Sequence, residues 1–382
     1  MKTYIVIAAI AGVLLFCTGC SQSVRKESGF ASFESLYTSG MDKLRKNDQK
    51  GAEEDFMAIL NRDRNSPMGY TGIALVELNR SEFRQGLLAI NRVVQRNPDF
   101  VDAYIVLGRI LIAQKKKAWF RDSIEAFEQA LNRDPDNNNA LYYCGESYLA
   151  NYTFDRAEQY FNRALQQQGA LKDSASAKLA FVTQIIKAGP VSKEGKQLVV
   201  DDTIDRAEMC VLLIEELNIK ELLKLYRLSF FQELFSLDNK LKKENIFIPA
   251  DVQSHPRRQW IVDSIPLQLP DLSILPDHKF YPDRTVTRAQ LAVIVHGVHR
   301  LLSDSTVVSE GHGVDESVIP DVRSDYYAFE AIRFCVGNGV MQPEISGTFR
   351  PYDTVSGLET IMTIRNLQGL ISKKPLNAAK DR

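Results

Sequence analysis

Residues 280–299 read Phe-Tyr-Pro-Asp-Arg-Thr-Val-Thr-Arg-Ala-Gln-Leu-Ala-Val-Ile-Val-His-Gly-Val-His. An aromatic turn around Pro282 precedes a helix whose expected N-cap is Thr287, because a threonine side chain accepts a hydrogen bond from the free amides of a first helical turn. Those amides and the guanidinium of Arg288 then share one corner. The stretch therefore predicts a helix N-terminus that can hold an anion.

The same register occurs twice more. Residues 203–208 read Thr-Ile-Asp-Arg-Ala-Glu, with Arg206 at the place of Arg288 and Leu198 at the place of the aromatic Phe280. Near the C-terminus, Gly357 takes the arginine place. Three copies in one register, over about half of the chain, form a specific pattern.

This pattern resembles the S-layer homology (SLH) motif, whose signature is an aromatic, a proline and then Thr-Arg-Ala-Glu opening a helix. The resemblance implies an SLH helical domain over residues 171–372, with motifs at about 171–219, 248–302 and 319–370, the third degenerate. Between the first two motifs lies an insert, 220–247, with an amphipathic helical pattern. It either packs inside the domain or covers the end of the repeats that precede it.

The SLH resemblance also implies a ligand. In that family the signature arginine faces a groove between adjacent motifs and holds the acid group of a cell-wall glycan, because a guanidinium gives a carboxylate two parallel hydrogen bonds. The positions that match the family's arginine, opening aspartate and aromatic are Arg206, Arg288, Asp251, Asp321, Trp260 and Tyr327. The alternative is that the arginines cap helices or pair with acids such as Asp205 and Glu208.

The third copy has Gly357 where the family has arginine, so its groove is expected to have lost its ligand. An arginine restored there is expected to create a third site if the other groove residues are present.

Residues 33–170 carry a second repeat. In each repeat of about 34 residues, two small residues precede one large apolar residue. The four sets are Gly40, Ala52 and Phe56; Ala74, Gly86 and Ile90; Gly108, Ser123 and Phe127; and Gly145, Ala157 and Phe161. This resembles four tetratricopeptide (TPR) repeats, each a helix pair in which small residues let the helices approach closely. The chain as a whole is therefore expected to be mainly α, with a TPR helical-hairpin solenoid followed by the SLH domain.

In TPR proteins the first helix of each repeat faces a concave groove. The register assigns to that groove Tyr37, Met41, Leu75, Ile105, Arg109, Tyr142 and Glu146. Such a surface, apolar with tyrosines and few charges, suits an extended peptide or a helix better than a nucleic acid. We expect these positions to face solvent unless they are occupied. Another part of this same chain could also fill the groove.

Composition and motifs exclude several classes of function. A formal charge of −1 over 382 residues argues against broad electrostatic binding to nucleic acid or to an acidic membrane surface. The sequence shows no nucleophile elbow, P-loop or paired-carboxylate signature. His296 and His299 lack further ligands for a metal. The chain is therefore expected to be no enzyme, without cofactor or metal.

The first residues form a targeting segment. An apolar run from Tyr4 to Phe16 is too short to span a membrane comfortably, and Cys17-Thr-Gly-Cys20 follows it. This resembles a bacterial lipoprotein signal, with signal peptide 1–19 and an acylated Cys20. Residues 20–32 would be a tether and residues 373–382 a tail. The alternatives are an uncleaved anchor or plain secretion.

Together these patterns predict a lipid-anchored cell-envelope scaffold, attached through Cys20 to an outer membrane and facing the periplasm. The TPR part would bind a protein or peptide partner, and the SLH part would bind peptidoglycan or an attached acidic cell-wall polymer. The alternative function is a protein-only adaptor for envelope assembly or secretion, in which the SLH motifs are purely structural.

Acylation of Cys20 is the first testable expectation, because the signal region ends at Thr-Gly-Cys after an apolar stretch too short to span a membrane comfortably. Mass spectrometry of the mature N-terminus should find a lipid-modified cysteine as the first residue. A soluble protein that begins elsewhere would contradict this expectation.

Overall fold

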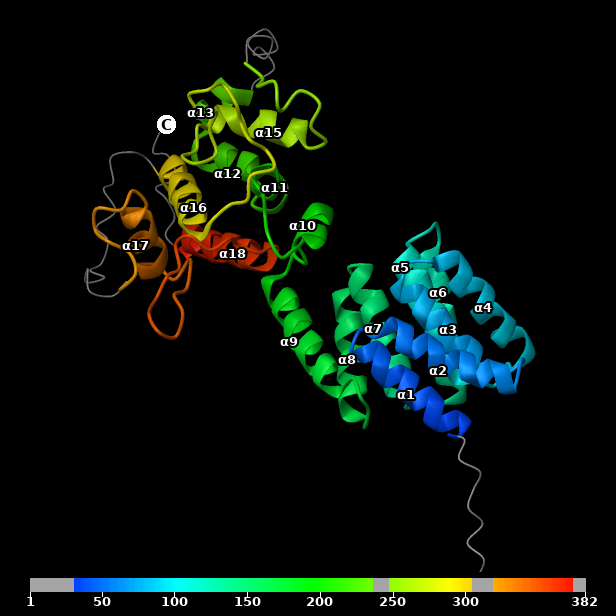
Figure 1. Ribbon diagram of the computed structural model, residues 1–382. Coiled ribbons are helices and arrows are strands. Elements are labelled where there is room, and N and C mark those ends of the chain that lie inside the picture. The colour runs from blue at the N-terminus through cyan, green and yellow to red at the C-terminus, as the bar shows by residue number, and fades with distance from the viewer. Residues whose placement is uncertain (1–30, 236–246, 304–318, 374–382) are drawn as a thin grey trace, which may run out of the picture. The chain divides into compact units, whose positions relative to one another are not determined.

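The computed structural model describes residues 31–235, 247–303 and 319–373, and these ranges are folded mostly as helices (Figure 1). The prediction of a mainly α chain is confirmed. The helical elements are α1 (Phe33–Arg45), α2 (Gln49–Arg62), α3 (Pro67–Asn79), α4 (Phe83–Arg96), α5 (Val101–Gln114), α6 (Trp119–Arg133), α7 (Asn138–Ala150), α8 (Phe154–Gln166), α9 (Lys172–Ala188), α10 (Lys193–Leu198), α11 (Arg206–Val211), η1 (Leu212–Glu216), α12 (Ile219–Tyr226), α13 (Leu228–Phe235), α15 (Arg258–Ser264), η3 (Ile265–Leu267), α16 (Arg288–Leu302), α17 (Phe329–Gly337) and α18 (Gly357–Lys373).

Some of the sequence-based expectations fall outside these ranges. The signal peptide, Cys20, most of the tether and most of the tail are not among the described residues. Within the described ranges, no helix is both long and apolar enough to cross a membrane.

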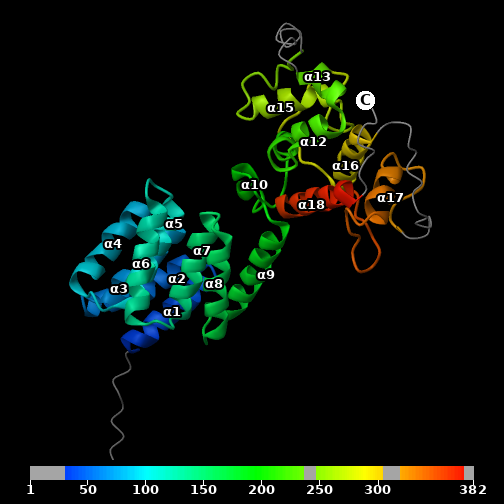
Figure 2. The ribbon, with the colours of Figure 1, turned by 180° about the vertical axis from the view of Figure 1, so that it is seen from behind.

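The chain divides into two compact units, Met1–Val106 and Leu107–Arg382. The division falls inside α5, within the repeats, and not after residue 170, where the sequence places the end of the repeats. In the second unit, α9 packs along α8 and also contacts α18 (Figures 1 and 2). This helix joins the last repeat to the helices that follow it.

The repeat pattern of small and aromatic residues has a direct packing cause. In the first unit the ring of Phe56 fills the space that side chains would occupy at Gly40 and Gly72, where a Cβ atom would lie 2.5 and 2.2 Å from it. In the second unit, Phe127 lies in the same way against Gly108. Each aromatic ring is fully buried and needs a glycine opposite it, so the spacing of these residues sets the helix pairing.

The three sequence copies form three segments of the second unit, which lead into α11, α16 and α18 respectively. Backbone hydrogen bonds join these segments pairwise at three junctions, so that they form a ring. The amide of Val286 donates to the carbonyl of Ile204 (2.8 Å), the amide of Val355 to Val286 (3.0 Å), and the amide of Ile204 to Val355 (2.9 Å). All three side chains are buried. These residues occupy equivalent places before α11, α16 and α18, so the three copies found in the sequence are equivalent in space as well.

The predicted N-cap is confirmed, but the anion corner is not. Thr287 accepts a hydrogen bond from the amide of Gln290, as expected. The next two amides are already used, since Arg288 donates to the carbonyl of Asp353 (2.8 Å) and Ala289 to that of Pro351 (3.0 Å). The helix N-terminus therefore holds the neighbouring segment in place of an anion.

At the third junction of the ring, a glycine takes the place of the arginine. The amide of Gly357 donates to the carbonyl of Asp201 (2.9 Å), and a Cβ atom at Gly357 would lie 1.7 Å from the carbonyl oxygen of Leu198. No side chain fits there, so the expectation that an arginine at this position would create a third site is wrong.

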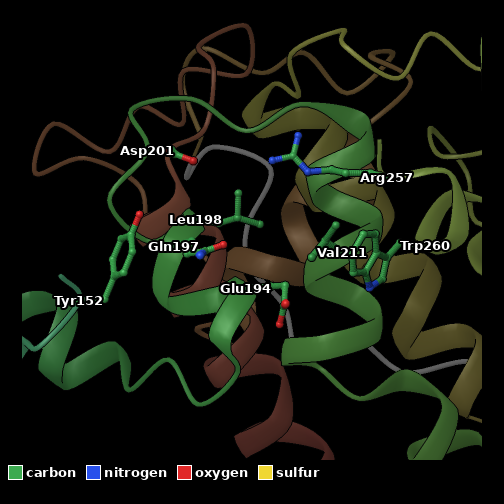
Figure 3. Close-up of a pocket in the computed structure, with 8 residues that line it drawn as sticks. All are labelled: Tyr152, Glu194, Gln197, Leu198, Asp201, Val211, Arg257 and Trp260. Carbon is green, nitrogen blue, oxygen red and sulfur yellow. The ribbon is translucent and has the colours of Figure 1, made fainter. Parts of the chain in front are cut away.

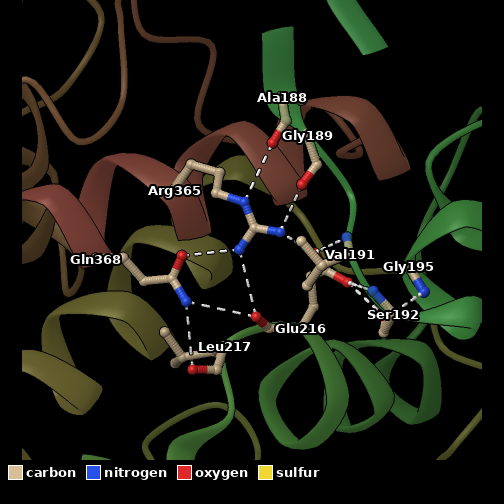
Figure 4. A network of polar contacts seen from close by, with 9 residues as sticks. All are labelled: Ala188, Gly189, Val191, Ser192, Gly195, Glu216, Leu217, Arg365 and Gln368. Atoms are coloured by element: carbon tan, nitrogen blue, oxygen red, sulfur yellow. Dashed lines mark hydrogen bonds and ion pairs between the residues drawn. The ribbon is translucent and has the colours of Figure 1, made fainter. Parts of the chain in front are cut away.

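A polar cluster from α18 fastens this third junction (Figure 4). Arg365 forms an ion pair with Glu216, whose side chain is fully buried, and donates to the carbonyls of Ala188 (3.2 Å) and Gly189 (2.9 Å). Glu216 also accepts from the amide of Val191 at 2.9 Å. The cluster ties the end of α9 and the π-helical turn η1 to α18.

The described part of the insert packs inside the domain. Ile219 and Leu223 of α12 are completely buried, α12 contacts α16, and Arg227 donates to the carbonyl of Leu301 at 3.4 Å. Residues 236–246 of the insert lie outside the described ranges.

Gly357→Ala tests the tight junction, with Gly369→Ala on the same helix as the matched control. A methyl group at position 357 would overlap the Leu198 carbonyl, so the free energy of unfolding should fall by about 2 kcal/mol or more. Nothing lies within 4 Å of a Cβ at Gly369, so that substitution should raise stability by about 0.5 kcal/mol through helix propensity. Urea denaturation measures both, and equal effects would contradict the proposed clash.

Candidate functional site

The two signature arginines are buried between neighbouring segments. Arg206 is 4% exposed. Its guanidinium lies 4.6 Å from the ring centre of Phe280 and donates to the carbonyls of Phe280 (2.8 Å), Ser273 (2.9 Å) and Asp271. Arg206 therefore crosses from the first segment into the loop of the second.

Arg288 repeats this arrangement one junction further on. It is 5% exposed, lies 4.7 Å from the ring centre of Phe349, and donates to the carbonyls of Phe349 (2.6 Å) and Gln342 (2.9 Å). It also forms an ion pair with Glu359. Burial lowers the pKa of both guanidinium groups from their usual value.

These contacts correct the expectation that the arginines face an open groove. Their donors are directed at carbonyl groups of the next segment, so they hold the segments together. The alternative of pairing with an acid holds for Arg288, but the acid is Glu359. Asp205 and Glu208 pair with a different arginine, Arg257.

The two opening aspartates also hold the chain together. Asp251 accepts from the amides of Phe280 (3.0 Å) and Tyr281 (2.7 Å). Asp321 accepts from the amide of Phe349, likewise at 2.7 Å. Each carboxylate thus fixes the aromatic turn of its own segment.

A pocket of about 420 Å³ lies between the first and second segments (Figure 3). Its lining residues come from the turn between α7 and α8, from α10 and the loop after it, from α11 and from the start of α15: Tyr152, Glu194, Gln197, Leu198, Asp201, Val211, Arg257 and Trp260. Pockets of this size are typical of small-ligand sites. Of the residues that the sequence proposed, Trp260 lies here.

Arg257 is the pocket residue that sequence reasoning missed. It stands three residues before Trp260 and outside every motif position, so only its place beside that tryptophan could have signalled it. Its guanidinium lies 2.8 Å from a carboxylate oxygen of Glu208 and 3.9 Å from one of Asp205. The indole N–H of Trp260 donates to Glu215 at 2.8 Å. Of the charged residues that line the pocket, Glu194 and Asp201 are acids, and Arg257 is held by two further acids.

Tyr327 belongs to a separate aromatic surface. Tyr327 is 62% and Tyr352 73% exposed, and both rings contact Tyr326 edge-on, with ring centres at 4.9 and 5.8 Å. The structure thus places Trp260 and Tyr327 at two different surfaces.

The expected TPR groove is only partly open. Leu75 (2% exposed), Ile105 (4%) and Tyr142 (8%) are buried, which corrects the expectation that they face solvent. Tyr142 packs against Phe161, with ring centres 5.6 Å apart, and burial raises its pKa to about 12.

The other expected groove residues are half-buried: Tyr37, Met41, Arg109 and Glu146. In the first unit Tyr37 donates to Asp102 at 3.0 Å. In the second unit Arg109 stacks on Tyr143 at 4.6 Å, and Glu146 pairs with Lys178 of α9 at 3.2 Å. Near Glu146, α9 therefore contacts the surface that the sequence assigned to the groove, which is the kind of contact expected if another part of this chain fills it.

Two family models match parts of the chain. The model described as Tetratricopeptide repeat matches residues 71–118 and 120–172, and the model described as S-layer homology domain matches residues 318–361. The chain thus contains TPR repeats followed by an SLH domain near its C-terminus. The SLH match falls on the segment that the sequence reading treated as degenerate.

Two curated proteins are similar to part of this chain. The peroxisomal targeting signal receptors of Komagataella phaffii (strain GS115) and Komagataella pastoris are 35% identical over 98 residues, which is 25% of this chain and 16% of theirs. The match therefore spans about a sixth of these relatives.

Two solved structures are also similar. A thermophilic TPR protein of Thermus thermophilus is 18% identical, with a TM-score of 0.36, and the match covers 44% of this chain and 87% of that one. MamA is 23% identical, with a TM-score of 0.28, and the match covers 38% and 81%.

TPR repeats indicate protein–protein interaction, and an SLH domain indicates cell-wall binding and an association with the cell envelope. Both are interaction modules without catalytic function.

Arg288→Gln should destabilise the fold, because it leaves Glu359 and two carbonyls of the next segment without their charged donor. We expect a loss of about 3 kcal/mol in the free energy of unfolding. The control is Arg333→Gln, since the pair of Arg333 with Glu330 is largely exposed and should contribute less than about 0.5 kcal/mol. Chemical denaturation decides, and unchanged stability of the Arg288 variant would show that the arginine is free to serve a ligand.

Proposed function

We propose that the protein is a lipid-anchored scaffold of the cell envelope, in which the TPR repeats bind a protein partner and the SLH domain binds peptidoglycan or a polymer attached to it. The observation that carries the proposal is the presence of both interaction modules in one chain. The lipid on Cys20, and with it a place at the outer membrane facing the periplasm, forms part of this proposal.

We take all three segments of the ring as SLH motifs. The family model covers the third. The closed ring of hydrogen bonds supports extending the assignment to the other two, as does the insertion of Arg206 and Arg288 into equivalent loops. Asp251 and Asp321, which hold equivalent turns, support it further.

The wall-binding surface in this proposal is aromatic. Since the arginines are used within the domain, we assign the contact with sugar to Trp260 in the pocket and to exposed Tyr327 with Tyr352. Aromatic faces bury apolar area against a flat ligand, while the polar side chains around them fix its orientation. Gln197, Glu194 and Asp201 can form hydrogen bonds with sugar hydroxyls in the pocket.

Within the first unit we assign the partner surface to half-buried Tyr37 and Met41, and within the second unit to half-buried Arg109. These residues combine apolar area with hydrogen-bonding groups, which suits a peptide or a helix.

The protein-only adaptor remains the second candidate. It is favoured by the burial of Arg206 and Arg288, which removes the donors that the family uses for an acidic polymer.

Sedimentation with purified sacculi tests wall binding. Trp260→Ala and Tyr327→Ala should each reduce binding, with the larger loss of about tenfold for Trp260, which corresponds to about 1.4 kcal/mol of contact energy. Ile345→Ser is the control, because Ile345 is fully exposed and outside both surfaces. Melting temperatures of all variants should stay close to that of the parent chain. Failure of the unaltered chain to bind sacculi would leave the adaptor function.

A further inference from the structure

We propose that the pocket between the first and second segments binds an amino sugar through its free, protonated amine. This rests on the proposed wall-binding function and specifies which group the pocket takes. It departs from the acid group that the sequence led us to expect.

The first argument is the charge around the pocket. Glu194 and Asp201 are lining residues, and Figure 3 shows them on either side of Gln197 and Leu198. Three further acids contact lining residues: Asp205 and Glu208 contact Arg257, and Glu215 accepts from the indole of Trp260. Among the lining residues only Arg257 is cationic, so acids outnumber bases and an added carboxylate would be repelled.

The second argument is the state of Arg257. A free guanidinium could reverse this preference, but this one is held by Glu208 at 2.8 Å and is close to Asp205 at 3.9 Å. To bind an acidic sugar, Arg257 would have to give up its ion pair with Glu208 for an ion pair with the sugar carboxylate, which would gain little binding free energy. An ammonium group instead finds the carboxylates of Glu194 and Asp201 in the lining of the pocket.

The third argument is the shape of the lining. The pocket holds about 420 Å³, and two aromatic side chains, Tyr152 and Trp260, stand on opposite sides of it in Figure 3. The other lining residues make the pocket mainly polar. Two aromatic side chains with polar groups around them suit a pyranose ring, whose faces are apolar and whose edge carries hydroxyl or amino groups.

The pKa of Asp201 agrees with this preference. Burial raises it, and the charge of Glu208 raises it further. An ammonium group placed beside this carboxylate would offset both effects, whereas an acid group would add to them.

The test uses the full chain and a matched pair of probes, a glucosamine tetramer and an N-acetylglucosamine tetramer, which differ in the amine alone. In calorimetric titration below the pKa of the sugar amine, the glucosamine tetramer should bind at least about tenfold more tightly. Glu194→Gln and Asp201→Asn should each bring the two affinities closer together.

The control variant is Asp202→Asn, because Asp202 is exposed and next to Asp201 but does not line the pocket. It should keep the preference for the amine. Trp260→Ala should weaken the binding of both tetramers. Equal affinity for the two tetramers, a preference for the acetylated one, or absence of binding to either would overturn the proposal.

A second measurement separates this proposal from wall binding in general. Sacculi whose free amines have been acetylated should retain less of the protein than untreated sacculi. Full retention on acetylated sacculi would overturn the amine assignment while leaving wall binding intact. Absence of binding to untreated sacculi would remove the wall-binding function itself.

Discussion

The ring of three backbone hydrogen bonds through Ile204, Val286 and Val355 is the constraint on which the C-terminal half depends. Because a buried amide without a partner costs about 1 to 3 kcal/mol, three segments that satisfy one another must come together as a set. The ring also brings the first amides of α11 and α16 against the carbonyls of the next segment. These bonds place the side chains of Arg206 and Arg288 against the loop of the next segment, where they donate to its carbonyls.

The third junction shows how the same architecture tolerates the loss of its arginine. At Gly357 the backbone itself approaches Leu198, and the ion pair of Arg365 with buried Glu216 lies on the same helix, α18, at a position further along. Arg365 binds the carbonyls at the end of α9, and α9 also packs on α8. The contacts of Arg365 therefore join α18 to Glu216 and also fix the end of α9, the helix that follows the repeats.

The sequence predicted those features that depend on residues nearby in the chain or on a fixed repeat. The cap at Thr287, the glycines that face Phe56 and Phe127, and the three copies in register all follow from neighbours a few residues away or from a fixed repeat. The role of Arg288 could not be predicted in this way, because its partners, Gln342 and Glu359, lie more than fifty residues further along the chain. Burial of the groove positions was missed for a related reason, since the face that Tyr142 takes depends on Phe161 of the following helix. Arg257 was missed because its partners, Asp205 and Glu208, stand about fifty residues earlier.

The distribution of charge sets what kind of recognition is left to the domain. Arginines that hold the ring together cannot also bind a ligand without weakening it, since each is bonded to carbonyls of the next segment. Besides Arg257, which Glu208 holds, the side chains with polar groups that line the pocket are aromatic, amide and carboxylate groups. Carboxylates accept hydrogen bonds and attract cations, which supports our proposal that this pocket takes hydroxyl and amino groups in preference to acids. Arg206 and Arg288 hold the segments together and are therefore not available to a ligand. Under this proposal, the other side chains between the segments determine which ligand is bound.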